Sequence, residues 1–190
     1  MTKSRLEAFS DGVIAIVITI MVLELKPPHE STFSALWHQY PLYLAYVLSF
    51  TIIGIYWNNH HHLLHSIKKI SGGVMWANLH LLFWLSLIPI ATAWAGETNF
   101  ATVPVAIYGI VLLGCAIAFT VLQLFLIKAN GKDSEVALAL GRDVKGKASV
   151  GIYLLAIPLA WVLPLLSCML YFVVAIIWFI PDRRFEHRES

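Results

Sequence analysis

The stretch FSDGVIAIVITIMVLEL, from Phe9 to Leu25, decides the fold class of this chain. Between Val13 and Leu23 every residue is apolar except Thr19, and such a run is typical of a helix that crosses a lipid bilayer. Basic residues precede the stretch, as they do in a signal peptide, but no small-residue cleavage site follows it. We therefore expect this segment to stay in the protein as its first membrane helix.

The remainder of the chain has the same character. Of the 190 residues, 59% are apolar and 13% are charged, a balance that suits lipid. One helical crossing takes about 20 mainly apolar residues, so this length allows several. Charge-poor stretches predict six spans, at about 9–25, 35–58, 74–94, 101–127, 150–166 and 168–180. We expect an all-α membrane protein, a single six-helix transmembrane domain over residues 1–190, whose last two spans form a hairpin.

The basic residues predict the orientation, because Lys and Arg accumulate on the cytoplasmic side of membrane helices. Six spans with both termini in the cytoplasm place twelve of the thirteen basic residues inside and leave only Lys26 outside. The inward set is Lys3, Arg5, Lys68, Lys69, Lys128, Lys132, Arg142, Lys145, Lys147, Arg183, Arg184 and Arg188. We expect a multi-pass protein of the cell membrane. The net charge of +2 indicates no nucleic-acid partner.

Helical phase divides the first span into two faces. At about 100° per residue, one stripe collects Gly12, Ile16, Thr19, Ile20 and Leu23, whereas Asp11 points away from it. A stripe of this kind lines a narrow conduit only where several copies meet around an axis. Aliphatic side chains on membrane helices also face lipid or pack, and a single Thr often bonds a carbonyl of its own helix. Phase alone leaves both interpretations open.

A motif at the start of this span favours the conduit. Residues Arg5 to Asp11 read Arg-x-x-x-Phe-Ser-Asp, and the aliphatic helix with one Thr follows directly. The second span ends in Trp57-Asn58-Asn59-His60-His61. Together with six spans in about 190 residues, these features resemble the transmembrane protein 175 family, potassium channels of bacteria and of animal lysosomes.

The resemblance implies a homotetramer with the first helices around a central pore. The permeating ions would be K⁺ and other monovalent cations, the partners would be further copies of the chain and the bilayer, and no cofactor is implied. The constriction would fall on Ile16, Ile20 and Leu23, with Thr19 one step away.

The chemistry of such a constriction differs from that of a carbonyl filter, since no Thr-Val-Gly-Tyr-Gly segment occurs. Converging Ile side chains offer a cation no ligand, so passage requires widening of the pore or partial loss of the hydration shell. Potassium loses its shell more cheaply than sodium, and Thr19 hydroxyls would steady the ion. We expect moderate K⁺ selectivity and a hydrophobic gate that closes by dewetting.

Two acidic residues flank the stripe. Glu24, just beyond Leu23, either concentrates cations at the pore entrance or pairs with Lys26 at the membrane surface. Asp11 needs a partner, because an unpaired carboxylate at the membrane edge is costly. We expect Asn78 and His80 to supply it, with Arg5 or Trp57 nearby, in a structural network. The members of that network are Arg5, Phe9, Ser10, Asp11, Trp57, Asn78 and His80.

Two other functions compete with a channel. Asp11, His80 and Glu24 are titratable, as a proton-coupled transporter would require. A membrane enzyme would use the histidines, since residues i and i+4 on a helix can share a metal. The cluster is His60, His61, His62 and His65. It has no carboxylate or Cys beside it in the sequence, and no nucleophile–base pair is recognisable, so we expect neither a bound metal nor an enzyme.

Overall fold

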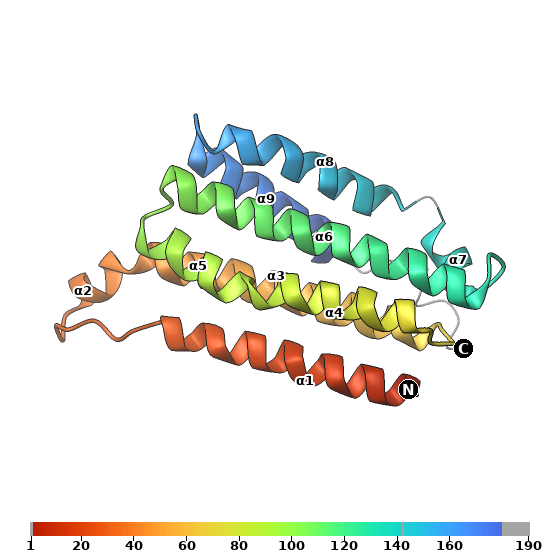
Figure 1. Ribbon diagram of the computed structural model, residues 1–190. Helices are drawn as coiled ribbons and strands as arrows, with labels where there is room; N and C mark the ends of the chain where they lie inside the picture. Colours follow the sequence, from red (N-terminus) through yellow and green to blue (C-terminus); the bar gives the residue numbers. More distant parts are fainter. Residues whose placement is uncertain (1, 142, 180–190) are drawn as a thin grey trace.

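The computed structural model describes residues 2–141 and 143–179, which form helices and, within those ranges, no β-strand. The helices lie side by side in an elongated bundle, with α1 at one edge (Figure 1). Their bounds are α1 Lys3–Met21, the 3₁₀ turn η1 Val22–Glu24, α2 Phe33–His38, α3 Tyr40–His65, α4 Gly72–Ser86, α5 Ile88–Glu97, α6 Thr102–Asn130, α7 Glu135–Leu140, α8 Val144–Leu159 and α9 Pro164–Phe179. The predicted all-α class is confirmed.

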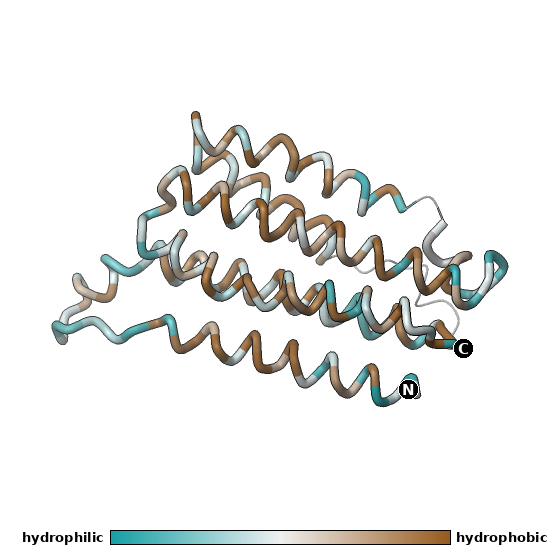
Figure 2. The backbone as a smooth tube through the Cα atoms, viewed as in Figure 1, coloured by the Kyte–Doolittle hydropathy of each residue, from teal (hydrophilic) through white to brown (hydrophobic). Residues whose placement is uncertain are grey.

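Four helical segments are long and apolar enough to cross a membrane. They are Lys3–Glu24, Tyr40–His65, Gly72–Glu97 and Thr102–Asn130, and the apolar helix Pro164–Phe179 is shorter. The middle parts of the helices are mainly hydrophobic, whereas hydrophilic residues are concentrated toward their ends (Figure 2). The predicted basic residues Arg142, Arg183, Arg184 and Arg188, and residue 180 at the end of the last predicted span, lie outside the described residues.

The third apolar segment is two helices in succession. The predicted stretch 74–94 is divided between α4 and α5, which meet at Leu87. Pro89 lies at the start of α5, where its missing N–H and its ring oppose a continuous helix. The segment from Gly72 to Glu97 is therefore one apolar stretch whose helix is interrupted at Leu87.

The hairpin of α8 and α9 turns earlier than the sequence indicates. The break falls at 160–163, whereas the predicted boundary lies near Ser167. Pro164 begins α9, a position that proline favours because its fixed φ suits the first helical turn. Ser167 lies inside α9, where its hydroxyl donates to the Ala156 carbonyl at 2.8 Å and joins the two arms.

Helix α1 packs on α3, α4 and α5 through one face only. The buried positions recur every three or four residues, as in an amphipathic helix, although all but one of them are apolar. They are Leu6, Ser10, Ile14, Val17 and Met21. This packing turns the opposite face of α1 away from the bundle.

Candidate functional site: the first helix and its anchors

The stripe that helical phase predicts is the uncovered face of α1 and η1 in the single subunit. The exposed fractions are 58% for Ile16, 43% for Ile20 and 72% for Leu23. Gly12 and Thr19 are exposed on the same side. We call these five residues the uncovered stripe. In a folded subunit they are available to lipid, to another copy of the chain or to a permeating ion.

Thr19 satisfies its donor within its own helix. The hydroxyl lies 3.0 Å from the carbonyl oxygens of Ala15 and of Ile16, so its one hydrogen is used in the backbone. The lone pairs of the hydroxyl oxygen remain on the exposed side. Thr19 can therefore act as an acceptor or as a cation ligand, but it is not a free donor.

Glu24 ends the 3₁₀ turn that continues α1. It is half-buried and lines a cavity of about 260 Å³ together with Lys26, His38 and Glu97. Because this cavity combines carboxylates with an ammonium and an imidazole, Glu24 does not lie in a purely acidic field.

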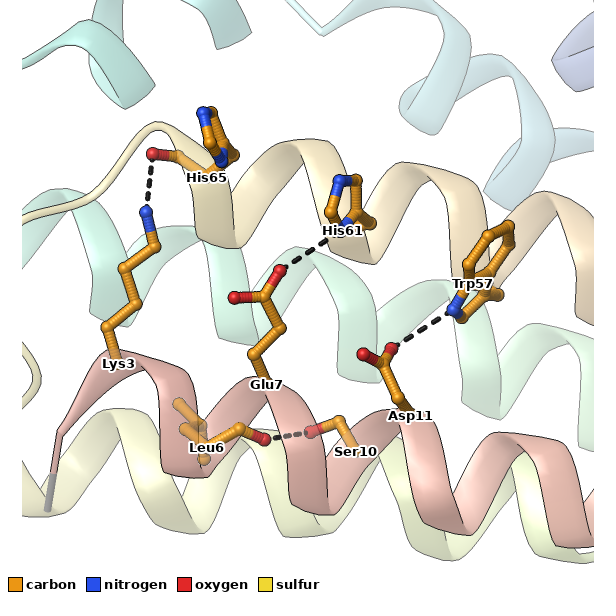
Figure 3. A network of polar contacts seen from close by, with 8 residues as sticks. All are labelled: Lys3, Leu6, Glu7, Ser10, Asp11, Trp57, His61 and His65. Atoms are coloured by element: carbon orange, nitrogen blue, oxygen red, sulfur yellow. Dashed lines mark hydrogen bonds and ion pairs between the residues drawn. The ribbon is translucent and has the colours of Figure 1, made fainter.

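Three contacts at successive helical turns join α1 to α3 (Figure 3). They are Lys3 Nζ donating to the His65 carbonyl at 2.8 Å, His61 Nδ1 facing Glu7 Oε1 at 3.0 Å, and Trp57 Nε1 donating to Asp11 Oδ1 at 3.0 Å. The residues advance by four along both helices, so each turn of α1 meets one turn of its antiparallel neighbour. We call this set the α1–α3 ladder.

The ladder corrects one expectation about the histidines. A carboxylate does accompany them, because Glu7 lies against His61 across the helix interface. The spacings of Lys3, Glu7 and Asp11, and of Trp57, His61 and His65, are the sequence signal that pairs the two helices. Among the described residues, no group of three His, Cys, Asp or Glu side chains is placed to hold a metal ion.

A second set of contacts is buried and joins α1 to α4 and α3. Ser10 Oγ donates to the Leu6 carbonyl at 2.8 Å, and Asn78 Nδ2 donates to Ser10 Oγ at 2.9 Å. Asn78 Oδ1 lies 2.7 Å from His60 Nε2. Ser10, Asn78 and His60 are all 0% exposed. We call this set the buried chain.

The buried chain fixes the tautomer of His60. Since the hydroxyl hydrogen of Ser10 goes to Leu6, the nitrogen of Asn78 must donate to Ser10 and its oxygen must face His60. His60 Nε2 therefore carries a hydrogen and donates. The other ring nitrogen, Nδ1, is buried without a hydrogen-bond partner in the described part of the chain.

Of the residues expected around Asp11, Trp57 contacts it and Asn78 and His80 do not. Its carboxylate accepts from Trp57, whereas Asn78 binds Ser10 one residue earlier. His80 is exposed and accepts from Trp84 on its own helix at 3.0 Å. The expected pairing of Asp11 with Asn78 and His80 is therefore corrected, because α4 presents Asn78 to the buried face of α1 and His80 away from it.

The remaining residues of the expected network lie outside both sets of contacts. Arg5 and Phe9 are exposed, Phe9 at 48%. His60 was not singled out from the sequence as the buried member of the histidine run. Its position seven residues, or two helical turns, after the fully buried Ile53 is the signal that identifies it.

Comparisons with known proteins agree with this geometry. The family model described as endosomal/lysosomal potassium channel TMEM175 matches residues 5–89, which include the buried chain and the α1–α3 ladder except Lys3. A protein named as a potassium channel in Chryseobacterium sp. (strain P1-3) is 52% identical over 186 residues, covering 98% of this chain and 97% of that protein. An animal relative, the endosomal/lysosomal proton channel TMEM175 of Gallus gallus, is 35% identical over 103 residues, covering 48% of this chain and 21% of its own length.

A solved structure extends the likeness to the fold. The crystal structure of a lysosomal potassium-selective channel TMEM175 homolog from Chamaesiphon minutus superposes with a TM-score of 0.85 at 31% identity, covering 95% of this chain and 97% of that one. Sequence identity and fold agree over nearly the whole length of both bacterial relatives. This chain is a membrane protein that belongs to the TMEM175 family.

Proposed function

We propose that this protein is a potassium-permeable cation channel of the cell membrane, built from four copies around their first helices. The observation that carries the proposal is the uncovered stripe, an apolar face that the subunit leaves open while it anchors the opposite face of the same helix. The names of the bacterial relatives support K⁺ as the permeating ion.

The proposed topology has six spans and cytoplasmic termini. The segments Lys3–Glu24, Tyr40–His65, Gly72–Glu97 and Thr102–Asn130 supply the first four spans. The arms of the hairpin, α8 and α9, supply the fifth and sixth, and the distribution of basic residues supports the orientation.

The proposed constriction consists of Ile16, Ile20 and Leu23 from each subunit. Two sets of polar contacts, the α1–α3 ladder and the buried chain, attach α1 to the bundle. Both lie away from the uncovered stripe, which stays directed outward. Four such stripes around an axis make a hydrophobic neck that excludes water when narrow and conducts when wider. Gate and constriction then coincide.

Moderate selectivity for K⁺ over Na⁺ follows from the cost of partial dehydration in that neck. The oxygen of Thr19 supports this role, because its hydrogen is used in the backbone and its lone pairs remain exposed. Glu24, next after Leu23, is the proposed entrance group. Its cavity also contains Lys26, so its attraction for cations is partly compensated.

A matched pair of substitutions tests the proposal. Leu23 is 72% exposed on the uncovered stripe, and Leu155 is 71% exposed on α8. In reconstituted bilayers we expect Leu23→Ala to change K⁺ conductance or the K⁺/Na⁺ permeability ratio and Leu155→Ala to change neither. Equal currents from the wild type and Leu23→Ala would contradict a constriction at this position.

A proton-coupled transporter using Asp11, His80 and Glu24 has less support. Asp11 bonds Trp57 and His80 bonds Trp84, so the groups do not share one relay. The same recordings separate the two functions: a channel reverses at the K⁺ equilibrium potential, whereas a coupled transporter shifts that potential with the proton gradient.

A further inference from the structure

The short helix α2 lies outside the proposed spans, at the end of the bundle where α1 ends and α3 begins (Figure 1). Residues 25–32 join it to Glu24, the last residue of the first apolar segment, and Gln39 alone separates it from α3. Thr32 caps its start, because the Thr32 hydroxyl accepts from the Ala35 amide at 3.2 Å. It is therefore a capped helix held at the level where two proposed spans leave the membrane.

One face of α2 is apolar and uncovered. Phe33 is 91% exposed, Leu36 44% and Trp37 73%, and no residue of α2 is buried. At about 100° per residue these positions share one side of the helix, as in an amphipathic helix. The stripe continues into Tyr40, whose ring stacks on that of Trp37 with the centroids 5.7 Å apart. A contiguous exposed patch of large apolar side chains marks a contact surface.

The other face of α2 is turned toward the proposed pore entrance. His38 lies across the helix from Phe33 and lines the cavity of about 260 Å³ that also contains Glu24 and Lys26. Ser34, on the same side as His38, is exposed. Because His38 faces the end of α1, the apolar stripe of α2 points away from α1.

The direction and chemistry of this stripe indicate what covers it. The proposed assembly places the other subunits around an axis beside α1, so a face that points away from α1 does not face that axis. Trp and Tyr rings at the end of a span are typical of the membrane–water interface, where the ring lies among lipid and its polar atom reaches water. The surface of the bilayer therefore fits this face better than a second copy of the chain does.

We propose that α2 is an interfacial membrane helix, which lies on the outer leaflet with Phe33, Leu36 and Trp37 inserted at the boundary between headgroups and acyl chains. The assignment to the outer leaflet rests on the topology proposed above. Lipid holds α2 by its apolar face, and the opposite face, with His38, stays beside Glu24. The bilayer then fixes one wall of the cavity at the pore entrance.

Nitroxide labels at neighbouring positions test this proposal in the full-length protein, reconstituted in phosphatidylcholine nanodiscs. Cys168→Ala removes the partly exposed native thiol, and Cys115 is 0% exposed. Phe33→Cys places a label on the apolar face, and Ser34→Cys, at an exposed position of the same helix, is the matched control. Oxygen concentrates in lipid and a nickel chelate stays in water, so the ratio of their accessibilities reports which solvent surrounds each label.

We expect the oxygen-to-nickel ratio to be several-fold higher for Phe33→Cys than for Ser34→Cys. Equal ratios, with nickel reaching both labels, would mean that α2 lies in water and would overturn the proposal. Low accessibility of both reagents at Phe33→Cys would mean that another subunit covers the stripe, and would overturn it as well. Because this readout requires no K⁺ conduction, its failure is distinct from a failure of the proposed channel.

A second substitution tests the contribution of Trp37. Adding Trp37→Ser should move the ratio for Phe33→Cys toward that for Ser34→Cys, because the stripe loses its interfacial ring. Trp76→Ser on α4 is the matched control, since Trp76 is 75% exposed and Trp37 is 73% exposed, and it should leave the ratio unchanged. An unchanged ratio after Trp37→Ser would overturn the insertion of Trp37 into the interface.

Discussion

The imidazole of His61 faces the carboxylate of Glu7 across the α1–α3 interface, with Nδ1 and Oε1 3.0 Å apart. The side chain of His61 is 46% exposed and that of Glu7 is 22% exposed, so water and salt reach both. The contact is a half-exposed ion pair whose strength depends on the protonation of the ring.

Glu7→Gln tests the contribution of this contact. The substitution keeps the shape of the Glu7 side chain and removes its negative charge, so any attraction between that charge and the His61 ring is lost. Exposed pairs contribute about 0–1 kcal/mol, so the variant should lose no more than about 1 kcal/mol of stability in thermal unfolding. A clearly larger loss would contradict a half-exposed pair.

Asn78→Leu should be more damaging, because it interrupts the buried chain. The Nε2 hydrogen of His60 would lose its acceptor in a fully buried position, at a cost of about 1–3 kcal/mol. His80→Leu, on an exposed position of the same helix, is the control and should have little effect on thermal unfolding in detergent. Adding His60→Leu to Asn78→Leu removes the donor that has lost its acceptor, so part of the lost stability should be recovered. A further loss of stability of similar size would argue against the hydrogen bonds of the buried chain.

Gly114→Ala should destabilise the contact between α6 and α4. A Cβ at Gly114 would meet the ring of Trp84, and overpacking of this kind costs about 1–3 kcal/mol. Gly54 in α3 has no atom within 4 Å of an added Cβ, so Gly54→Ala should raise the melting temperature through helix propensity alone. If Gly114→Ala also raised the melting temperature, the Trp84 ring would have moved aside at little cost.

Thr19→Val and Thr19→Ser test whether the hydroxyl oxygen of Thr19 or the volume of its side chain affects selectivity for K⁺ over Na⁺. Valine retains the volume and removes the ligand, so the K⁺/Na⁺ permeability ratio should fall. Serine retains a hydroxyl that can bond the same carbonyls, so the ratio should stay near the wild-type value. Bi-ionic reversal potentials measure both, and an unchanged ratio in Thr19→Val would remove Thr19 from the selectivity mechanism.

Helical phase grouped Ile16, Thr19 and Leu23 on one stripe of the first helix, because positions on a helix repeat with its turn, but phase alone did not decide whether that stripe is packed or uncovered. The direction of Asp11 away from Ile16 and Leu23 followed from the same periodicity. The partner of Asp11 was not predictable in this way, since phase assigns a face to each helix but no register between two helices. Asn78 lies one residue away from its expected contact for that reason.

The boundaries of the later helices depended on proline. Composition identified the apolar stretches around Pro89 and Pro164, but the same composition does not locate a break within them. The interruption at Leu87 and the turn at 160–163 come from the missing N–H and fixed φ of these residues. Pro89 and Pro164 therefore mark the breaks that composition leaves open.

The α1–α3 ladder has a repeat of four residues on both sides, and this periodicity gives it a second possible register. Sliding α1 by four residues, about 6 Å, would bring Glu7 opposite His65 and Asp11 opposite His61. Each carboxylate would then meet an imidazole, but Trp57 would lose its acceptor and Lys3 would lose the His65 carbonyl. The same shift would separate Ser10 from Asn78, so the buried chain selects the register that the ladder alone leaves ambiguous.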